Sequence, residues 1–459
     1  MGDRYDAIVV GAGQAGPSLA VRLAKSGRRV AIVERHLFGG TCVNTGCTPT
    51  KALVASARVA HMARRGAEYG LVLAEPPRFD FAAAMRRKDA IVEQSRSGLE
   101  KWLRGTAGLT VIEGHARFES PHAMRVGARL IEAPEIFLDV GGRAAEPSFE
   151  GVKDVPYLTN STILALRSLP RHLVVVGGSY VGLEFAQMFR RFGSEVTVVE
   201  KGERLIARED PEISDAVRAI LEGEGIRVRL RAECIALSRH AEGVAVGVHC
   251  DEDPHEAVGS HVLLAVGRRP NTDDLGLDRA GVPRDERGNI VVDDRLRTPV
   301  EGIWALGEAN GRGAFTHTTY NDYEIVAENL LDGASRKVSD RIPVYALFTD
   351  PPLGRAGMGE HEVRASGRRA RVARLAMEKV SRAKERGETQ GLMKILVDAG
   401  NGHILGAAFL GIEGDEAIHA ILDAMYAGAT FETLRRAVHI HPTVSEFIPT
   451  MMGELEDLA

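Results

Sequence analysis

The sequence predicts an α/β fold in which a strand–glycine turn–helix–strand unit occurs twice, followed by a smaller C-terminal α+β region. Three observations support this prediction. A glycine-rich turn between two apolar, strand-like runs begins at Gly11, and a turn of the same form begins at Gly177. After Arg341 the pattern changes to short strands that alternate with helices. A chain of 459 residues with 44% hydrophobic residues is also long enough for about three domains with cores of their own.

The first unit spans residues 5–34. Residues 5–10 are typical of a buried strand, residues 18–25 of a helix, and residues 29–33 of a second strand. In such a unit the first glycine makes the turn, the second lets a pyrophosphate approach the backbone, and the third packs the helix on the strand, while an acidic residue binds a ribose hydroxyl. Because two predicted strands frame the glycines and an acidic residue ends the second strand, the segment indicates a Rossmann-like dinucleotide site. Its key residues are Gly11, Gly13, Gly16 and Glu34.

The second unit, residues 173–200, matches the first without a gap. Gly177, Gly182 and Glu200 align with the first glycine, the third glycine and the acid. Ser179 stands where a middle glycine is usual, which adds a side chain near the expected pyrophosphate. Two dinucleotide sites imply two dinucleotides, and we expect one to be a bound flavin and the other a nicotinamide donor.

Two cysteines follow the first unit in the segment GGTCVNTGCTPTK, residues 39–51. Five residues of regular helix rise about 7.5 Å, more than a disulfide tolerates, so Cys42 and Cys47 can pair only if the backbone between them departs from a helix. Pro49 suits the first turn of the helix that follows, which places Cys47 at the positive helix end, where a thiolate is stabilised. A structural disulfide and a zinc site are the alternatives. We interpret the pair as redox-active, because it lies in a glycine-rich turn directly after a nucleotide-binding unit.

Near the end of the chain, His441 and Glu446 form a possible acid–base pair. Thiol–disulfide exchange needs a base that forms the attacking thiolate and an acid that protonates the leaving one. A histidine titrates in the required range, and a carboxylate can fix its tautomer. A capping or core role is the alternative for His441. We discount metal binding with His439, because no third ligand stands at a suitable spacing.

Composition excludes several classes of function. The net charge of −5 argues against nucleic acid or an anionic membrane as the main partner, and no apolar run approaches the roughly 20 residues that span a bilayer. The first strand begins at Tyr5, so we expect no signal peptide. Four cysteines in such a chain indicate a reducing compartment. We therefore expect a cytoplasmic protein.

The whole chain resembles the pyridine nucleotide–disulfide oxidoreductases of the glutathione reductase and lipoamide dehydrogenase type. The resemblance implies an FAD-binding domain, an NAD(P)-binding domain and a C-terminal α+β dimerisation domain. It rests on residues 11–16 with Glu34, 39–51, 177–184, 267–271, 302–308 and 441–446. The implied domains are residues 1–147 for FAD, 148–271 for NAD(P), 272–338 for the return to the FAD domain, and 339–459 for dimerisation.

The resemblance also implies catalytic roles. Cys42 would be the exposed interchange thiol and Cys47 the thiolate lying against the flavin. Lys51 would pair with Glu184 near the flavin N5. His441, oriented by Glu446, would be the acid–base partner of Cys42 in the other subunit of a homodimer.

The cofactors implied are FAD and NAD(P)H, with no metal. Glu308 would bind the flavin ribityl chain, where the family usually has Asp. The cofactor-binding residues that we expect are Gly11, Gly13, Gly16, Glu34, Thr41, Lys51, Gly114, Ala116, Gly307, Glu308, Gly177, Ser179, Gly182, Glu200 and Gly267.

Within the family, the motifs are most similar to the branch of mercuric reductases and reactive-chlorine-resistance flavoprotein reductases. The similarity lies in Ser179 and in residues 49–51 and 349–353. A true mercuric reductase is disfavoured, because residues 451–459 hold no vicinal cysteine pair and because mercuric reductases depart from the pattern at His441.

We therefore expect an FAD-dependent NAD(P)H oxidoreductase that reduces the Cys42–Cys47 disulfide and then a small-molecule or protein disulfide. The alternatives are a soft-metal-ion reductase acting on Hg(II) or Cu(II), a dihydrolipoamide dehydrogenase-like enzyme, and a non-catalytic redox sensor. Glu200 can hold both ribose hydroxyls and repels a 2′-phosphate, although Lys201 and Arg204 lie nearby. We expect NADH to be used at least as well as NADPH.

Overall fold

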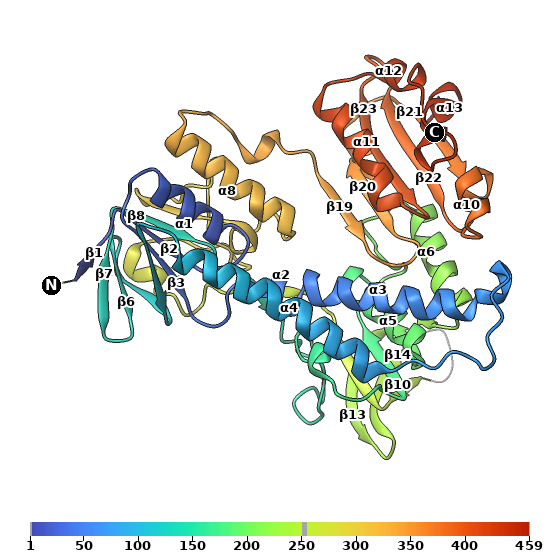
Figure 1. The fold of residues 1–459 in the computed structure, drawn as a ribbon, viewed down its shortest axis with the longest axis horizontal. Helices are drawn as coiled ribbons and strands as arrows, with labels where there is room; N and C mark the ends of the chain where they lie inside the picture. Colours follow the sequence, from blue (N-terminus) through green and yellow to red (C-terminus); the bar gives the residue numbers. More distant parts are fainter. Residues whose placement is uncertain (1, 250–254, 459) are drawn as a thin grey trace. The chain divides into compact units, whose positions relative to one another are not determined.

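The computed structural model describes residues 2–249 and 255–458, which form two compact units (Figure 1). Each unit is assembled from three separate stretches of the chain. Unit 1 comprises Met1–Ala52, Ala83–Glu146 and Val266–Arg341, and unit 2 comprises Leu53–Ala82, Pro147–Ala265 and Ile342–Ala459. The predicted α/β fold class is confirmed. The four predicted domain ranges remain our proposed division of the chain.

The centre of unit 1 is a five-stranded parallel sheet, ordered β18-β8-β2-β3-β4. Along β2 the buried residues alternate, with Ala7 and Val9 in one apolar cluster and Ile8 and Val10 in another, as the period of two along a strand requires. Helices α1 and α8 supply Leu19 and other residues to the first cluster. The bounds are β2 Ala7–Val10, α1 Gly16–Lys25, β3 Val30–Glu34, β4 Leu109–Glu113, β8 Glu135–Leu138, β18 Ile303–Ala305 and α8 Thr316–Leu331.

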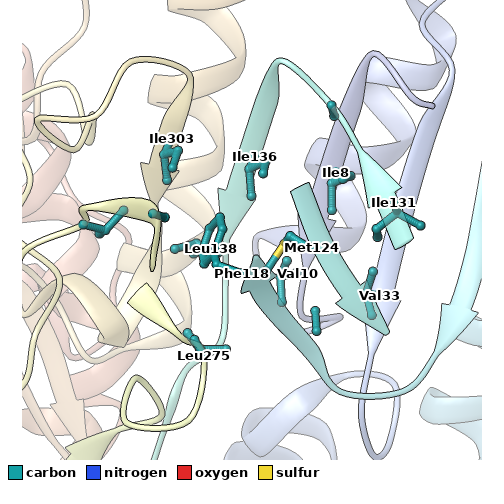
Figure 2. Close-up of a cluster of buried hydrophobic side chains, with 14 of the residues drawn as sticks. Ile8, Val10, Val33, Phe118, Met124, Ile131, Ile136, Leu138, Leu275 and Ile303 are labelled. Atoms are coloured by element: carbon teal, nitrogen blue, oxygen red, sulfur yellow. The ribbon is translucent and has the colours of Figure 1, made fainter. Parts of the chain in front are cut away.

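A second sheet of unit 1, ordered β1-β7-β6-β5, covers the other face of the parallel sheet. Figure 2 shows Phe118, Met124 and Ile131 of this sheet packed in one apolar cluster with Ile8 and Val33 of the parallel sheet. A short antiparallel pair, β9 with β17, completes the unit. The bounds are β1 Asp3–Arg4, β5 Ala116–Ser120, β6 Ala123–Val126, β7 Arg129–Glu132, β9 Gly142–Ala144, β17 Arg268–Pro270 and α7 Leu277–Ala280.

The cysteine segment forms two helices, α2 (Gly40–Thr45) and α3 (Cys47–Arg64), rather than a glycine-rich turn and one helix. The helix α2 is only six residues long and begins after Gly39, whose φ of 93° is left-handed. So short a helix has no apolar periodicity that the sequence could reveal. The next α-helix in the chain is α4 (Phe81–Arg104).

Unit 2 contains a second parallel sheet, ordered β12-β11-β10-β16, with the predicted helix α5 after β10. An antiparallel sheet, β13-β14-β15, is inserted before β16. The bounds are β10 His172–Val176, α5 Tyr180–Phe192, β11 Glu195–Val199, α6 Pro211–Gly223, β12 Arg227–Arg229, β13 Glu233–His240, β14 Gly243–His249, β15 Glu256–Gly259 and β16 His261–Leu264.

The C-terminal region of unit 2 forms a six-stranded antiparallel sheet, ordered β19-β20-β23-β22-β21-β24, with α11 packed on it. The short strands and helices predicted after Arg341 are present. The bounds are β19 Val344–Leu347, β20 Leu353–Gly357, α9 Glu360–Ala365, β21 Ala370–Ala376, α10 Ser381–Glu385, β22 Leu392–Asp398, β23 Ile404–Leu410, α11 Gly414–Tyr426, α12 Phe431–Arg435, α13 Ile448–Gly453 and β24 Glu456–Asp457.

Short 3₁₀ turns connect several of these elements, and η3 (Gly307–Asn310) lies between β18 and α8. The other turns are η1 Gly66–Tyr69, η2 Ile163–Ala165, η4 Val338–Asp340, η5 Met377–Lys379 and η6 Ser445–Phe447. Within residues 2–249 and 255–458, no helix combines the length and apolar character needed to cross a lipid bilayer.

Candidate active site

The first glycine turn joins β2 to α1 in unit 1. Gly11 has a φ of 103°, and a Cβ there would lie 2.1 Å from the carbonyl oxygen of Asp139, so only glycine fits. A Cβ on Gly16 would lie 2.1 Å from the carbonyl oxygen of Gly11, which is how this glycine lets α1 pack on the strand. The Glu34 carboxylate accepts hydrogen bonds from the N–H groups of Ala12 and His36, both at 2.8 Å.

The second glycine turn, in unit 2, repeats this geometry. Gly177 has a φ of 115°, and a Cβ on Gly182 would lie 2.1 Å from the Gly177 carbonyl oxygen. The Glu200 carboxylate accepts hydrogen bonds from the N–H groups of Gly178 at 2.6 Å and Gly202 at 2.7 Å. Ser179 is exposed and precedes the first residue of α5. The two acids thus hold the two turns in the same way, as the gapless alignment predicts.

A cavity of about 230 Å³ opens at this second turn. Ser179, Glu200, Arg204, Arg208 and Tyr345 contribute to its lining. The lining also includes Glu209, so it combines two carboxylates with two guanidinium groups beside the glycine turn. Arg355 donates to the Glu209 carboxylate at 3.0 Å, and Glu209 also accepts from the Tyr345 hydroxyl, so this wall of the cavity is held by buried polar contacts.

A buried carboxylate lies at the first turn. Asp139 directly follows β8, is 5% exposed, and accepts hydrogen bonds from the N–H groups of Ala15 at 3.2 Å and Gly16 at 2.8 Å. Burial raises the pKa of Asp139 to about 7, although these two N–H groups oppose the rise. Sequence reasoning missed this residue, because nothing in its local pattern distinguishes it from other residues after a strand.

The two cysteines are brought together by a break between two helices of the chain. The helix α2 ends at Thr45, Gly46 has φ −135° and ψ −120°, and α3 begins at Cys47. A Cβ on Gly46 would lie 2.9 Å from the Thr41 carbonyl oxygen, so the break leaves no room for a side chain there. The predicted departure from a regular helix and the predicted place of Cys47 at a helix start are both confirmed.

Cys42 and Cys47 are free thiols in this structure, and the Thr316 hydroxyl contacts both. Thr316 Oγ1 lies within donating distance of both sulfurs, 3.1 Å from Cys42 Sγ and 3.3 Å from Cys47 Sγ. The pKa of Cys47 is lowered to about 6, first by the hydrogen bond from Cys42 and also by the Thr316 hydroxyl and the charge of Lys51, although burial opposes the change. The same bond and burial raise the pKa of Cys42 well above its ordinary value. Cys47 is therefore the thiolate of the pair.

Glu308, expected at the flavin ribityl chain, forms an ion pair with Arg268. Arg268 donates to both carboxylate oxygens, at 2.6 and 2.8 Å, and to the Gly142 carbonyl oxygen at 2.8 Å. The Thr41 hydroxyl donates to the same carbonyl at 3.4 Å. Gly307, just before Glu308, has a φ of 68° and donates its N–H to the Asp322 carboxylate.

The remaining expected cofactor residues occupy turns or strand ends. Gly114 follows β4 with a φ of 146°, and Ala116 begins β5 and is buried. Gly267 has a φ of 125° and accepts the N–H of Ala145 on its carbonyl. Glu184, in unit 2, is 5% exposed, and its carboxylate accepts the Phe348 N–H at 3.0 Å. Lys51 belongs to unit 1, so its pairing with Glu184 stays a prediction.

His441 and Glu446 come together as predicted from their spacing. His441 Nδ1 lies 2.7 Å from Glu446 Oε2, and the side chains are 74% and 11% exposed. The carboxylate thus fixes one ring nitrogen, while the imidazole extends into solvent. His439 Nδ1 instead lies 2.6 Å from the Ser445 carbonyl oxygen. Across residues 2–249 and 255–458, no group of three or more His, Cys, Asp or Glu side chains could hold a metal ion.

Comparison with known proteins shows the family. The family model described as pyridine nucleotide-disulphide oxidoreductase matches residues 5–322, and the model of its dimerisation domain matches residues 344–452. The chain belongs to this family.

Individual members of the pyridine nucleotide-disulphide oxidoreductases match nearly the whole chain. RclA of Escherichia coli, named a probable pyridine nucleotide-disulfide oxidoreductase, is 37% identical over 452 residues, covering 97% of this chain and 98% of RclA. A mercuric reductase of Streptomyces lividans is 36% identical and a dihydrolipoyl dehydrogenase of Haloferax volcanii 32% identical, each covering 96% of this chain and 94% of the relative.

Solved structures match equally well. The structure of E. coli RclA, described as an HOCl-induced flavoprotein disulfide reductase, has a TM-score of 0.89 at 35% identity and covers 98% of this chain and 99% of that one. Its Cu(II) complex has the same TM-score and coverage at 34% identity.

The chain is therefore a flavin-dependent pyridine nucleotide–disulfide oxidoreductase, and the family binds FAD and NAD(P)H. Both glycine turns have the tight form that such cofactors require, since Gly11 and Gly177 have φ of 103° and 115° and a Cβ there would lie 2.1 or 2.4 Å from a backbone oxygen. The dimerisation domain supports a homodimer. Thr316 and Arg268 were missed from the sequence, because Thr316 reaches Cys42 from 274 residues away and Arg268 reaches Gly142 from 126 and Glu308 from 40 residues away.

Proposed function

We propose that this enzyme passes electrons from NAD(P)H through FAD to the Cys42–Cys47 disulfide and on to a disulfide acceptor. The observation that carries the proposal is the pair of thiols at the α2–α3 break, where the pKa of Cys47 is lowered to about 6. When bound, FAD supplies the hydride chemistry that links the nicotinamide to the disulfide. Cys47, at the start of α3 and near the charge of Lys51, is suited to remain a thiolate at neutral pH.

Cys42 is the thiol that reacts with the acceptor in this proposal. After losing its proton to a base, Cys42 attacks one sulfur of the acceptor disulfide, a mixed disulfide forms, and the first acceptor thiolate leaves with a proton. Cys47 then attacks Cys42 Sγ, which restores the Cys42–Cys47 disulfide and releases the second acceptor sulfur as a thiolate that takes a proton from the solvent. Two electrons thus leave the pair and reduce one acceptor disulfide to two thiols.

His441 is the acid–base group of this exchange. Its Nδ1 is held by Glu446 at 2.7 Å, which leaves Nε2 to accept a proton from Cys42 and return it to the leaving thiolate. The imidazole is 74% exposed, and the neighbouring side chains Val438 and Ile440 are 96% and 78% exposed. Exposed apolar side chains just before the catalytic histidine in the chain support a site completed by the other subunit of the homodimer.

NADH is our proposed donor, used at least as well as NADPH. Glu200 lies at the position where an acid binds the ribose hydroxyls, and its carboxylate is fixed by the N–H groups of Gly178 and Gly202. Arg204 and Arg208 line the same cavity and would attract a 2′-phosphate, so the proposed preference is slight. We also place the reaction in the cytoplasm, where a dithiol can be kept reduced.

The second candidate is reduction of a soft metal ion, Hg(II) or Cu(II). It is favoured by the names of two relatives, a mercuric reductase and a Cu(II) complex of RclA, and by the preference of soft metals for thiolates. A dihydrolipoamide dehydrogenase-like activity is a further alternative, since a relative carries that name. The His441–Glu446 pair favours the disulfide acceptor, because disulfide exchange needs a proton donor and metal binding does not. The same pair argues against a non-catalytic sensor.

The experiment that tests the proposal is a steady-state NAD(P)H oxidation screen against disulfides, quinones, Hg(II) and Cu(II), run with wild type, Cys42→Ser and Cys47→Ser. We expect disulfides to be turned over by the wild type alone. In Cys42→Ser, the Cys47 thiolate should give long-wavelength charge-transfer absorbance with the flavin without added reductant, and Cys47→Ser should lack it. Full turnover of the acceptor by both variants would mean that the dithiol is not involved, and turnover of a metal ion alone would establish the second candidate.

A further inference from the structure

Thr316 is the one hydroxyl that the described residues bring to both sulfurs of the redox pair. It is the first residue of α8, in unit 1, and stands 274 residues from Cys42 in the sequence. Its Oγ1 lies 3.1 Å from Cys42 Sγ and 3.3 Å from Cys47 Sγ, so it lies within hydrogen-bonding reach of either. A threonine hydroxyl carries a single proton, and it can therefore donate to only one of the two sulfurs at a time.

The side chain is held in this position by the start of α8. Phe315, which precedes the helix, is fixed by Thr318, whose hydroxyl accepts the Phe315 N–H at 3.1 Å and donates to the Phe315 carbonyl oxygen at 2.8 Å. Further along α8, Arg341 donates to Asn321 at 3.0 Å and pairs with Asp322. A β-branched side chain on a helix also has few χ1 rotamers. Thr318 thus secures the helix start, which leaves the Thr316 hydroxyl available to the sulfurs.

In the reaction proposed above, both sulfurs become anionic, because Cys47 is a thiolate from the start and Cys42 becomes one when the base takes its proton. In the resting dithiol the charge is on Cys47, which accepts hydrogen bonds from the Cys42 thiol and from Thr316. When Cys42 has lost its proton to the base and attacks the acceptor, it is an anion as well, and the Cys47 thiolate has no proton to donate to it. A hydroxyl that stays within reach of both sulfurs can stabilise each anion in turn, since donors to charged acceptors form the stronger hydrogen bonds.

We propose that the Thr316 hydroxyl follows the thiolate, donating to Cys47 in the resting dithiol and to Cys42 when that sulfur becomes the nucleophile. The inference rests on the proposed function, in which Cys47 is anionic from the start and Cys42 becomes anionic when it attacks. No bond to Thr316 forms or breaks, because only the direction of its O–H changes. Thr316 therefore acts on the acidity of both thiols and has no part in supplying electrons.

The test measures thiol acidity directly. The FAD-loaded enzyme is reduced with dithiothreitol, freed of reductant and treated with iodoacetamide at pH 4.5–10, and peptide mass mapping reports the alkylation rate of each cysteine separately. The variants are Thr316→Val, which removes the hydroxyl at nearly constant shape, and Thr316→Ser, which keeps it. Thr318→Val is the matched control, because it disturbs the same helix turn without touching a sulfur.

We expect Thr316→Val to move the midpoint of Cys47 alkylation upward by about one pH unit, the size expected of a hydrogen bond to a charged group. In a Cys47→Ser background, where Cys42 is the only thiol of the pair, Thr316→Val should raise the Cys42 midpoint as well. Thr316→Ser should restore both midpoints, and Thr318→Val, which only loosens the helix start, should move both midpoints by much less than Thr316→Val.

Three outcomes would overturn the inference. An unchanged Cys47 midpoint in Thr316→Val would mean that the Thr316 hydroxyl does not stabilise the Cys47 thiolate. A shift of the Cys47 midpoint without a shift of the Cys42 midpoint would mean that the hydroxyl donates to one sulfur only. Equal midpoint shifts in Thr318→Val would mean that Thr316 acts only through the fold of the helix start. None of these results depends on turnover, so a failure of the acceptor screen with the Cys variants remains separate from a failure of this inference.

Discussion

At the scale of single residues, Asp139 has the most unusual environment near the first glycine turn. Its carboxyl is buried and accepts two N–H groups at the start of α1, the region where the fold places a pyrophosphate. Burial raises its pKa from 3.8 to about 7. The folded protein therefore holds a proton there, over a range of pH in which the unfolded chain has lost it.

This raised pKa predicts how stability depends on pH. Between about pH 4 and pH 7 the folded state binds more protons at Asp139 than the unfolded state, so this residue makes stability fall as pH rises. Asp139→Asn, which stays neutral and can still accept the two N–H groups, should flatten that slope. At pH 8 the variant should be more stable than the wild type by on the order of 1 kcal/mol or more, since one pKa unit corresponds to about 1.4 kcal/mol.

The measurement is equilibrium urea unfolding of the FAD-loaded protein between pH 5 and pH 8. Asp278→Asn is the control, because the Asp278 side chain is 87% exposed and its removal should leave the slope unchanged. Parallel pH profiles for the wild type and Asp139→Asn would contradict the prediction.

At the scale of elements, the two strand–turn–helix–strand units have the same internal hydrogen bonds. Glu34 and Glu200 each receive one N–H from the glycine turn and one from the residue two positions after the acid. The distances differ by no more than 0.2 Å between the units. Each acid therefore fixes its own turn, and what distinguishes the two sites is the lining around them.

Glu200→Ala tests what this acid contributes to the choice of nicotinamide. We expect the wild type to use NADH at least as well as NADPH and the variant to lose roughly tenfold in the ratio of kcat/KM for NADH over NADPH, about the worth of one hydrogen bond to a charged group. Steady-state kinetics with both donors give the ratio. Arg204→Ala, from the same cavity, should shift the ratio the other way. A strong wild-type preference for NADPH would mean that the arginines govern the pocket.

What the sequence could predict follows from how local each signal is. The glycine turns, the helix start at Cys47 and the His441–Glu446 contact depend on residues close together in the chain, and each is present. Asp139 and Thr316 reach their partners from 124 and 274 residues away, and no local pattern carries that information. The short helix α2 was missed because six residues are too few to show helical periodicity.

At the scale of the whole molecule, the proposed site draws on two subunits. The thiols belong to unit 1 and the histidine to unit 2, which carries the dimerisation domain. In the proposed homodimer, Cys42 of one subunit reacts with help from His441 of the other. A single subunit would then contain both Cys42 and His441, but its own His441 could not exchange a proton with its own Cys42.

His441→Ala tests this arrangement. The variant should keep nearly normal reduction of its flavin by NAD(P)H, while disulfide reduction should slow by roughly 10²–10⁴, the usual worth of general acid–base catalysis. Stopped-flow absorbance and steady-state turnover separate the two steps. His439→Ala is the matched control, because its ring contacts a backbone carbonyl and not Glu446.

Hybrid dimers extend the same test. Mixing His441→Ala subunits with Cys42→Ala subunits should restore part of the activity, because each hybrid then contains one complete site. The absence of any recovery in properly formed hybrids would place each site within one subunit.

The break between α2 and α3 also determines what an oxidant does to this protein. A thiolate is the form of cysteine that peroxides and hypochlorite attack, so Cys47, with its pKa lowered to about 6, is oxidised first of the pair. The sulfenic acid formed there has a thiol beside it, and Cys42 can displace water from it to close the disulfide. That product is the same disulfide from which each catalytic cycle starts. The damage that would inactivate an isolated thiolate is in this chain undone by the next hydride from the nicotinamide.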